Sequence, residues 1–175
     1  MRILCFGDSN TYGYDPRGFF ADRYPPEDRW VDRTAQLTGH ELLNFGSNGR
    51  QIPRTGTILP DCDLLLVMLG TNDLLSGVSP KETAARMEDF LQPFLPHRRI
   101  LLVTPPPMKR GAWVTDESLV QTSRELAAEY ELLAEKLGIP YRDTRNWNID
   151  LAFDGVHFTE KGHREFARQL SNCLL

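Results

Sequence analysis

Cysteine is scarce in this chain, and its three copies are odd in number and lack the spacing of a metal site. Cys5 lies in a short apolar segment, where a reduced thiol behaves as a small hydrophobic side chain. Long apolar runs are missing too, because none approaches the ~18 residues that a membrane span needs. Residues 1–6 lead directly into a turn at Gly7, which leaves no room for a signal peptide. We therefore expect a cytoplasmic protein without disulfides, membrane span, metal or cofactor.

An excess of positive charge is also absent. The net charge of −4 and the isoelectric point near 5.6 argue against a nucleic-acid-binding protein, which usually carries a basic face. With 41% hydrophobic and 25% charged residues, the composition is that of an ordinary globular protein. A length of 175 residues is enough to bury one core, so we predict a single domain over residues 1–175.

Short apolar segments alternate with helical patterns along the whole sequence. The segment at 64–69 is apolar throughout, as expected of a central parallel strand that is covered on both faces. The predicted strands are residues 2–6, 41–45, 64–69, 100–104 and, at an edge of the sheet, 140–142. The predicted helices are residues 30–37, 80 to 90 or 94, 116–137, and a last one that Thr159 caps and that ends near 173. This alternation predicts an α/β fold with a parallel sheet of about five strands.

Polar or glycine-rich turns follow four of the predicted strands, at residues 7–10, 46–50, 70–73 and 104–108. The carboxyl ends of parallel strands meet at one edge of a sheet, and ligands bind beyond that edge. We therefore expect these turns to lie together. Asp154 and His157 precede the last predicted helix and can reach the same edge.

Ser9 lies in the first of these turns, within the sequence FGDSN at residues 6–10. A serine hydroxyl becomes a nucleophile when a base removes its proton. A helix that starts after Ser9 would also offer free N–H groups to a negative oxygen. The alternatives are a helix N-cap or a phosphate-binding turn. The surroundings do not match the Gly-x-Ser-x-Gly elbow of α/β-hydrolases.

Among the four histidines, His157 alone stands three residues after an aspartate, Asp154. That spacing allows the Asp154 carboxylate to bind the imidazole and fix its tautomer, as in a Ser-His-Asp triad. An Asp-x-x-His sequence also occurs by chance in structural roles. His163, in the first turn of the last predicted helix, is interpreted as structural.

Acyl transfer also requires hydrogen-bond donors for the negative oxygen of its tetrahedral intermediate. The Asn72 carboxamide follows the central predicted strand and is one candidate donor. A backbone N–H at Gly46 or Gly49 is another, because a glycine allows a close approach to the backbone. The alternative is that these residues only shape turns, which Asn and Gly often do.

Four ordered blocks resemble those of the SGNH (GDSL-type) hydrolases: Gly7-Asp8-Ser9, Gly49, Gly70-Thr71-Asn72-Asp73 and Asp154-Gly155-Val156-His157. The resemblance implies a flavodoxin-like three-layer α/β/α fold and no metal. It implies the following roles: Ser9 as nucleophile, His157 as base, Asp154 as its orienter, and an oxyanion hole of the Ser9 N–H, the Gly49 N–H and the Asn72 side chain. Gly49 fits better than Gly46 because it precedes Arg50, and Asn10 replaces the leucine of the GDSL motif.

Within this family, residues 2–9 and 68–73 and the prolines at 105–107 look most like the bacterial arylesterase and acyltransferase branch. The resemblance predicts a serine esterase that hydrolyses, or transfers, short acyl groups from small esters or acetylated sugars. One alternative is a lysophospholipase or thioesterase that acts on longer chains. Another is a non-catalytic binding module on the same fold. A phosphate- or nucleotide-binding protein is disfavoured, because the Gly7 turn lacks the required glycine spacing.

Aromatic residues near these blocks are predicted to wall a small acyl pocket. They are Tyr12, Tyr14, Phe19, Phe20, Trp113 and Phe153. The chain has no lipase-like lid segment, which favours small ester substrates. Trp113 is also a candidate for a contact between copies of the chain, so a homo-oligomer is a further hypothesis.

Overall fold

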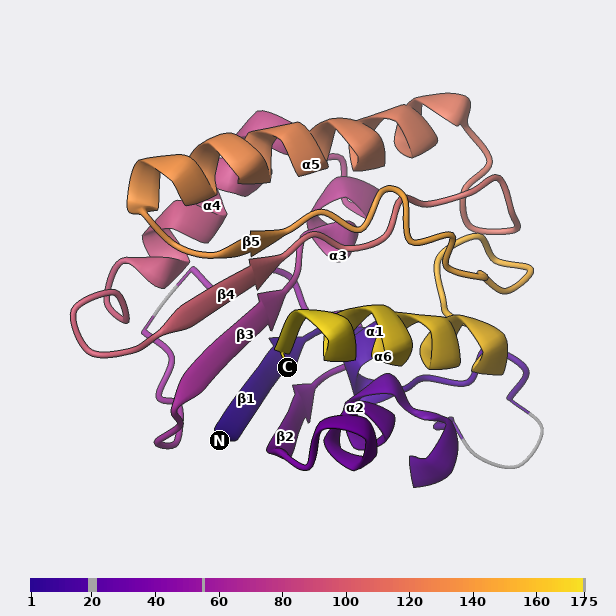
Figure 1. Ribbon diagram of the computed structural model, residues 1–175. Coiled ribbons are helices and arrows are strands. Elements are labelled where there is room, and N and C mark those ends of the chain that lie inside the picture. The colour runs from indigo at the N-terminus through magenta and orange to yellow at the C-terminus, as the bar shows by residue number, and fades with distance from the viewer. Residues whose placement is uncertain (19–21, 55, 175) are drawn as a thin grey trace.

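The computed structural model describes residues 1–18, 22–54 and 56–174, so Phe19 and Phe20 lie outside the described residues. Five parallel strands form one sheet in the order β2-β1-β3-β4-β5 (Figure 1). The strands are β1 (Arg2–Gly7), β2 (Glu41–Gly46), β3 (Leu64–Met68), β4 (Ile100–Val103) and β5 (Tyr141–Arg142). This is the strand order of flavodoxin-like folds. The predicted α/β fold and its five strands are confirmed.

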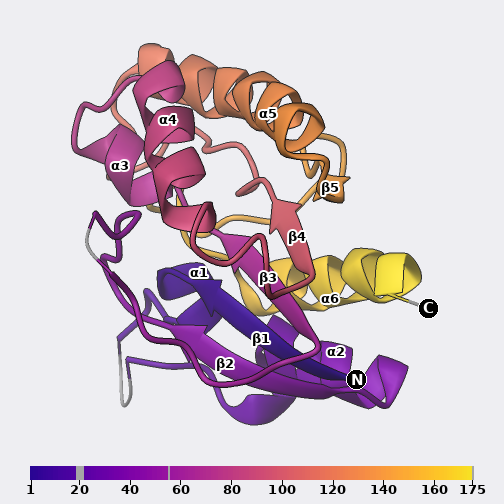
Figure 2. The same ribbon diagram turned by 90° about the vertical axis from the view of Figure 1, so that its left-hand side faces the viewer.

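Helices cover both faces of the sheet, which gives three layers (Figures 1 and 2). One face carries α3 (Thr71–Leu75), α4 (Pro80–Leu91) and α5 (Glu117–Leu137). The other carries α2 (Trp30–Thr38) and α6 (Glu160–Leu174), which pack against each other. The short helix α1 (Ser9–Tyr12) follows β1 directly, and a 3₁₀ turn, η1 (Pro26–Asp28), precedes α2. No helix among the described residues has the length and apolar character needed to span a membrane.

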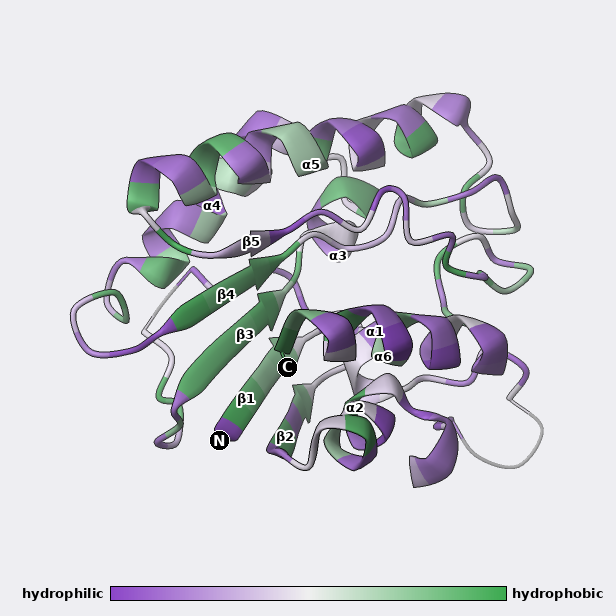
Figure 3. Cartoon of the chain, viewed as in Figure 1, coloured by the Kyte–Doolittle hydropathy of each residue, from purple (hydrophilic) through white to green (hydrophobic). Residues whose placement is uncertain are grey.

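The alternation of side chains along the strands divides the core into two clusters. Leu65 and Val67 of β3 pack toward α3, α4 and α5, whereas Leu66 and Met68 pack toward α2 and α6. Both faces of the strand are buried, which explains why its sequence is apolar without interruption. Figure 3 shows the same arrangement, with hydrophobic strands inside and hydrophilic residues on the outer sides of the helices. Each buried leucine contributes about 1.5–3 kcal/mol through the hydrophobic effect.

Side-chain caps fix where the longer helices begin. The Ser79 hydroxyl accepts a hydrogen bond from the Glu82 N–H at 3.2 Å, as its sequence pattern predicts. The Asp116 carboxylate accepts from the Ser118 N–H at 2.8 Å at the start of α5. The Thr159 hydroxyl accepts from the Gly162 N–H at 3.0 Å, which confirms Thr159 as a cap for α6. Each of these bonds satisfies an N–H that has no partner within its helix.

Two short helices differ from the sequence analysis. Helix α1 begins at Ser9 itself, because the Asp8 carboxylate accepts from the Asn10 N–H and serves as its N-cap. Ser9 is therefore not an N-cap. Helix α3 occupies residues that were expected to form only a turn. Its five residues are too few to show a helical period, and its N-cap is Gly70, whose φ of 126° disfavours any other residue.

Candidate active site

A chain of hydrogen bonds joins three buried side chains from opposite ends of the sequence. The Ser9 hydroxyl lies 3.0 Å from His157 Nε2. On the other side of the ring, His157 Nδ1 lies 2.7 Å from Asp154 Oδ2. The three residues are at most 6% exposed. The structure thus places the predicted serine, histidine and aspartate in one hydrogen-bonded row beyond the carboxyl end of β1.

Close packing at Gly7 places Ser9 at the end of the strand. A Cβ at Gly7 would lie 2.0 Å from the Thr11 hydroxyl oxygen, so only glycine permits this tight passage from β1 into α1. The Asp8 side chain then caps α1 and is itself buried. Burial raises the pKa of Asp8 to about 6, although the Asn10 N–H and the charges of His157 and Arg50 oppose that effect.

The loop before α6 orients His157 through its own hydrogen bonds. Leu151 and Phe158 pair as an antiparallel bridge, which brings the loop back on itself. Asp154 Oδ1 accepts from the N–H groups of Val156 and His157, both at 2.9 Å. Burial opposes ionisation of Asp154, but its bonds to the His157 ring and to these N–H groups outweigh that effect. The pKa of Asp154 is therefore held below its ordinary value.

A cavity of about 230 Å³ opens at the Ser9 hydroxyl, and we call it the Ser9 cavity. It is lined by Ser9, Tyr14, Asn48, Gly49, Asn72, Trp113 and His157. The rings of Tyr14 and Trp113 flank the imidazole of His157, with ring centroids at 4.6 and 5.0 Å. Predicted residues from four separate blocks of the sequence therefore meet around one small space.

Gly46 and Gly49 serve different purposes in the structure. A Cβ at Gly46 would lie 2.0 Å from the Tyr12 backbone nitrogen, so this glycine allows β2 and α1 to pack together. Gly49 has a φ of +70° and open space around it, and it lines the Ser9 cavity. Within the described part of the chain, the N–H groups of Ser9 and Gly49 have no hydrogen-bond acceptor. Both are free to bind a ligand in the cavity.

Asn72 reaches the same cavity from helix α3. Its Nδ2 donates a hydrogen bond to the Arg50 carbonyl oxygen at 3.0 Å. That bond orients the carboxamide and uses one of its two N–H hydrogens, which leaves the second for a ligand. Its neighbour Asp73 accepts from the Ile52 N–H at 3.1 Å and pairs with Arg86 at 3.2 Å. Asp73 therefore binds a neighbouring loop and helix α4 and forms no hydrogen bond with Ser9 or His157.

The sequence matches the GDSL-like Lipase/Acylhydrolase family over residues 5–165. The chain belongs to this family. It is a GDSL-type esterase/acylhydrolase, as the four sequence blocks predicted. No curated protein matches the sequence.

Solved structures resemble this esterase over nearly their whole length. The inhibitor-bound aryl esterase of M. smegmatis is 30% identical, with 99% of this chain and 97% of that chain covered and a TM-score of 0.85. A carbohydrate acetylesterase family member from Sinorhizobium meliloti is 26% identical, with 99% and 96% covered and a TM-score of 0.82. A member of the lipolytic G-D-S-L family from Veillonella parvula shares the fold at 20% identity, with 98% and 97% covered and a TM-score of 0.74.

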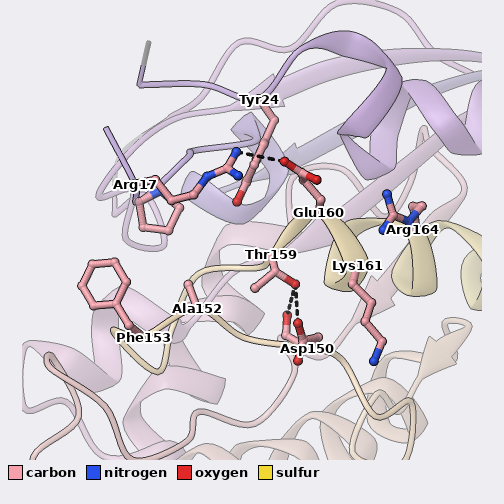
Figure 4. A pocket seen from close by; sticks show the side chains of 10 residues that line it. Arg17, Tyr24, Asp150, Ala152, Phe153, Thr159, Glu160, Lys161 and Arg164 are labelled. Carbon is pink, nitrogen blue, oxygen red and sulfur yellow. Dashed lines mark hydrogen bonds and ion pairs between the residues drawn. The ribbon is translucent and has the colours of Figure 1, made fainter. Parts of the chain in front are cut away.

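Two of the aromatic residues that were expected in the acyl pocket of this esterase lie elsewhere. The Tyr12 ring lies against the Arg23 guanidinium, 4.3 Å from ring centroid to Cζ, and does not line the Ser9 cavity. Phe153 is 67% exposed and lines a second cavity of about 380 Å³ (Figure 4). The two cavities share no lining residue. The Arg23 guanidinium holds Tyr12 there, because it also donates to the Tyr12 carbonyl oxygen at 2.7 Å.

Two pairs of the polar groups that line the second cavity bind each other, Arg17 with Glu160 and Thr159 with Asp150 (Figure 4). Arg17 forms ion pairs with Asp15 at 2.8 Å and Glu160 at 3.0 Å. The Thr159 hydroxyl donates to Asp150 Oδ2 at 2.6 Å. The cavity lies over the start of α6, and Asp150, Ala152 and Phe153 line it from the loop before that helix.

Sequence reasoning missed two residues that hold the site of the esterase together. The Arg50 guanidinium donates to the carbonyl oxygens of Gly7 and Phe45 and lies over the Phe6 ring at 4.4 Å. Asn10 is buried, and its carboxamide binds the backbone on either side of His157. For Asn10, the only signal in the sequence was the departure from the motif, where asparagine replaces leucine.

Proposed function

We propose that this esterase cleaves short acyl groups from small aryl esters or acetylated sugars through an acyl-enzyme on Ser9. The observation that carries the proposal is the hydrogen-bonded row of Asp154, His157 and Ser9 at the wall of the Ser9 cavity. Relatives described as an aryl esterase and a carbohydrate acetylesterase family member support this choice of substrates.

The row of hydrogen bonds determines where the proton goes. With His157 Nδ1 donating to the Asp154 carboxylate, the neutral ring has its lone pair on Nε2, which faces the Ser9 hydroxyl. His157 takes the hydroxyl proton as Ser9 Oγ bonds to the ester carbonyl carbon, and it then gives that proton to the departing alcohol. Water, activated by the same ring, cleaves the acyl-Ser9 ester. A second alcohol in place of water gives acyl transfer.

Three donors converge on the place where the carbonyl oxygen becomes negative. They are the N–H groups of Ser9 and Gly49 and the second N–H of the Asn72 carboxamide. All three residues line the Ser9 cavity, and the two backbone groups lack another acceptor in the described residues. Fixed donors of this kind stabilise the transition state, because they need no reorientation as charge develops.

The size of the Ser9 cavity favours short acyl groups over the longer chains of the lysophospholipase alternative. Sites that enclose a drug-sized ligand measure about 300–1,000 Å³, and this cavity of about 230 Å³ is smaller. Each methylene that fits adds about 0.8 kcal/mol of binding, whereas one that does not fit adds nothing or clashes. We therefore expect kcat/KM to be highest for acetate to butyrate esters and to fall by octanoate.

The test is a series of aryl esters from acetate to palmitate, assayed below the micellar concentration beside acetylated sugars, with Ser9→Ala as the blank. A faster turnover of palmitoyl esters or lysophospholipids than of acetates would replace the short-acyl proposal with the lipolytic one. An organophosphonate that reacts with activated serines should label Ser9. An unlabelled protein without hydrolysis would support the binding-module alternative.

A further inference from the structure

The hydrogen bonds inside the His157 loop fix the imidazole relative to Asp154 but not relative to Ser9. The bonds from Asp154 to the loop N–H groups and to the ring all lie within residues 154–157. Other bonds tie the loop to Lys109, Ala112 and Trp113, none of which belongs to α1. Some further contact must hold the base at the right distance from the nucleophile.

Asn10 provides that contact. Its Nδ2 donates to the Val156 carbonyl oxygen at 3.1 Å, and its Oδ1 accepts from the Phe158 N–H at 2.9 Å. These are the two peptide groups that flank His157. Among the described residues, the only other hydrogen bond from α1 to this loop is the one between Ser9 and His157 themselves.

The backbone of Asn10 is equally well anchored. Its N–H donates to the Asp8 carboxylate at 3.0 Å. Its carbonyl oxygen accepts from the indole N–H of Trp30 at 3.0 Å, and Trp30 is fully buried in the core. Every polar group of Asn10 therefore has a partner, and the residue directly after the nucleophile joins the core to the loop that carries the base.

We infer that Asn10 is a positioning residue that sets the distance between Ser9 and His157, an inference that rests on the function proposed above. The geometry needs a donor and an acceptor on one short side chain. Leucine, which the GDSL motif carries here, has neither and would leave the Val156 carbonyl and the Phe158 N–H buried without partners. Aspartate keeps the acceptor for Phe158 but offers no donor to Val156 when ionised.

Asn10→Leu and Asn10→Asp test this role in an assay of aryl acetate hydrolysis with the number of active sites titrated by an organophosphonate. Because a displacement of about 1 Å can cost about 10²-fold in rate, we expect Asn10→Leu to lower kcat per titrated site by roughly 10- to 100-fold. KM should change little, and Asn10→Asp should be intermediate. The matched control is Leu64→Ala. It removes a buried side chain at the start of β3, the end of the strand away from the Ser9 cavity.

Leu64→Ala should lower the melting temperature as Asn10→Leu does, yet keep the wild-type kcat per titrated site. A wild-type kcat per site in Asn10→Leu, with only fewer sites or a lower melting temperature, would overturn the inference and leave Asn10 a packing residue. Failure of the proposed function gives a different result, because the wild-type protein would then neither hydrolyse the ester nor react with the organophosphonate.

Discussion

Two buried histidines, six residues apart, have almost the same surroundings but different hydrogen bonds. His157 lies between the rings of Tyr14 and Trp113, and His163 lies between those of Tyr24 and Phe158. Both are at most 3% exposed.

Their ring nitrogens differ. Both nitrogens of His157 have close partners, a carboxylate on one side and a hydroxyl on the other. In His163, Nδ1 accepts only a long bond of 3.4 Å from the Trp30 N–H, and no partner for Nε2 is found in the described part of the chain. Burial among aromatic rings therefore does not distinguish an active-site histidine from a core histidine. The hydrogen-bond partners do, because a base needs one nitrogen oriented and the other free to exchange a proton.

Removing each imidazole in turn tests that distinction with the largest expected effect. If His157 and Ser9 act as a unit, as the proposed function requires, His157→Ala and Ser9→Ala should each cut kcat by roughly 10⁴-fold or more, and the double variant little further. His163→Phe, which keeps an aromatic ring in the core, should retain a kcat close to the wild-type value. Ester hydrolysis by the folded variants, confirmed by circular dichroism, is the measurement. Near-normal turnover by Ser9→Ala would end the triad assignment.

Removal of the Asn72 carboxamide tests the proposed oxyanion donor rather than the proposed base. Loss of one oxyanion donor costs about 2.7–4 kcal/mol of activation free energy, so Asn72→Ala should lower kcat by roughly two to three decades. KM should change little, because the bond strengthens only in the transition state. The control is Gln51→Ala, an exposed carboxamide nearby that binds the Ser76 hydroxyl. An effect confined to KM would mean that Asn72 binds the substrate in its ground state.

The burial of His163 should also appear as a loss of stability in acid, a smaller effect than those expected on catalysis. Burial lowers the pKa of His163 from 6.5 to about 3, with the charges of Arg29 and His157 adding to the effect. The unfolded chain therefore binds a proton that the folded protein excludes, so stability is lost as pH falls below 6.5. We expect this residue to cost roughly 2 kcal/mol of unfolding free energy by pH 5. Urea unfolding at pH 7, 6 and 5 measures the loss.

Replacement of His163 by Phe should remove that part of the acid sensitivity. Asp8 acts in the opposite direction, since its raised pKa of about 6 favours the folded state as pH falls. The difference between wild type and His163→Phe cancels the Asp8 contribution. Equal slopes of stability against pH in the two proteins would contradict the assignment.

The sequence predicted the parts of this site that depend on local pattern or on an ordered motif. The five strands follow from apolar runs, and the turns that follow them had to meet at one edge of a parallel sheet. Asn10 could not be assigned in the same way, because its partners lie 146 and 148 residues further along the chain. Tyr12 was misplaced because the sequence could not show that its ring would lie against Arg23. Helix α3 was too short to show a period.

The aromatic rings beside His157 are expected to have the smallest effect on kcat. Trp113 is 54% exposed, and its ring meets the imidazole edge to face at 5.0 Å. An aromatic pair of this kind contributes about 0.5–1.5 kcal/mol, so Trp113→Ala should lower kcat about 2- to 13-fold.

Phe153→Ala is the matched control. Phe153 is similarly exposed, and its carbonyl oxygen accepts from the Ala112 N–H, but it lines the second cavity. The Phe153→Ala variant should keep the wild-type kcat for aryl acetates. A loss in Phe153→Ala as large as that in Trp113→Ala would mean that both rings contact the substrate and that the contact with His157 is not what matters.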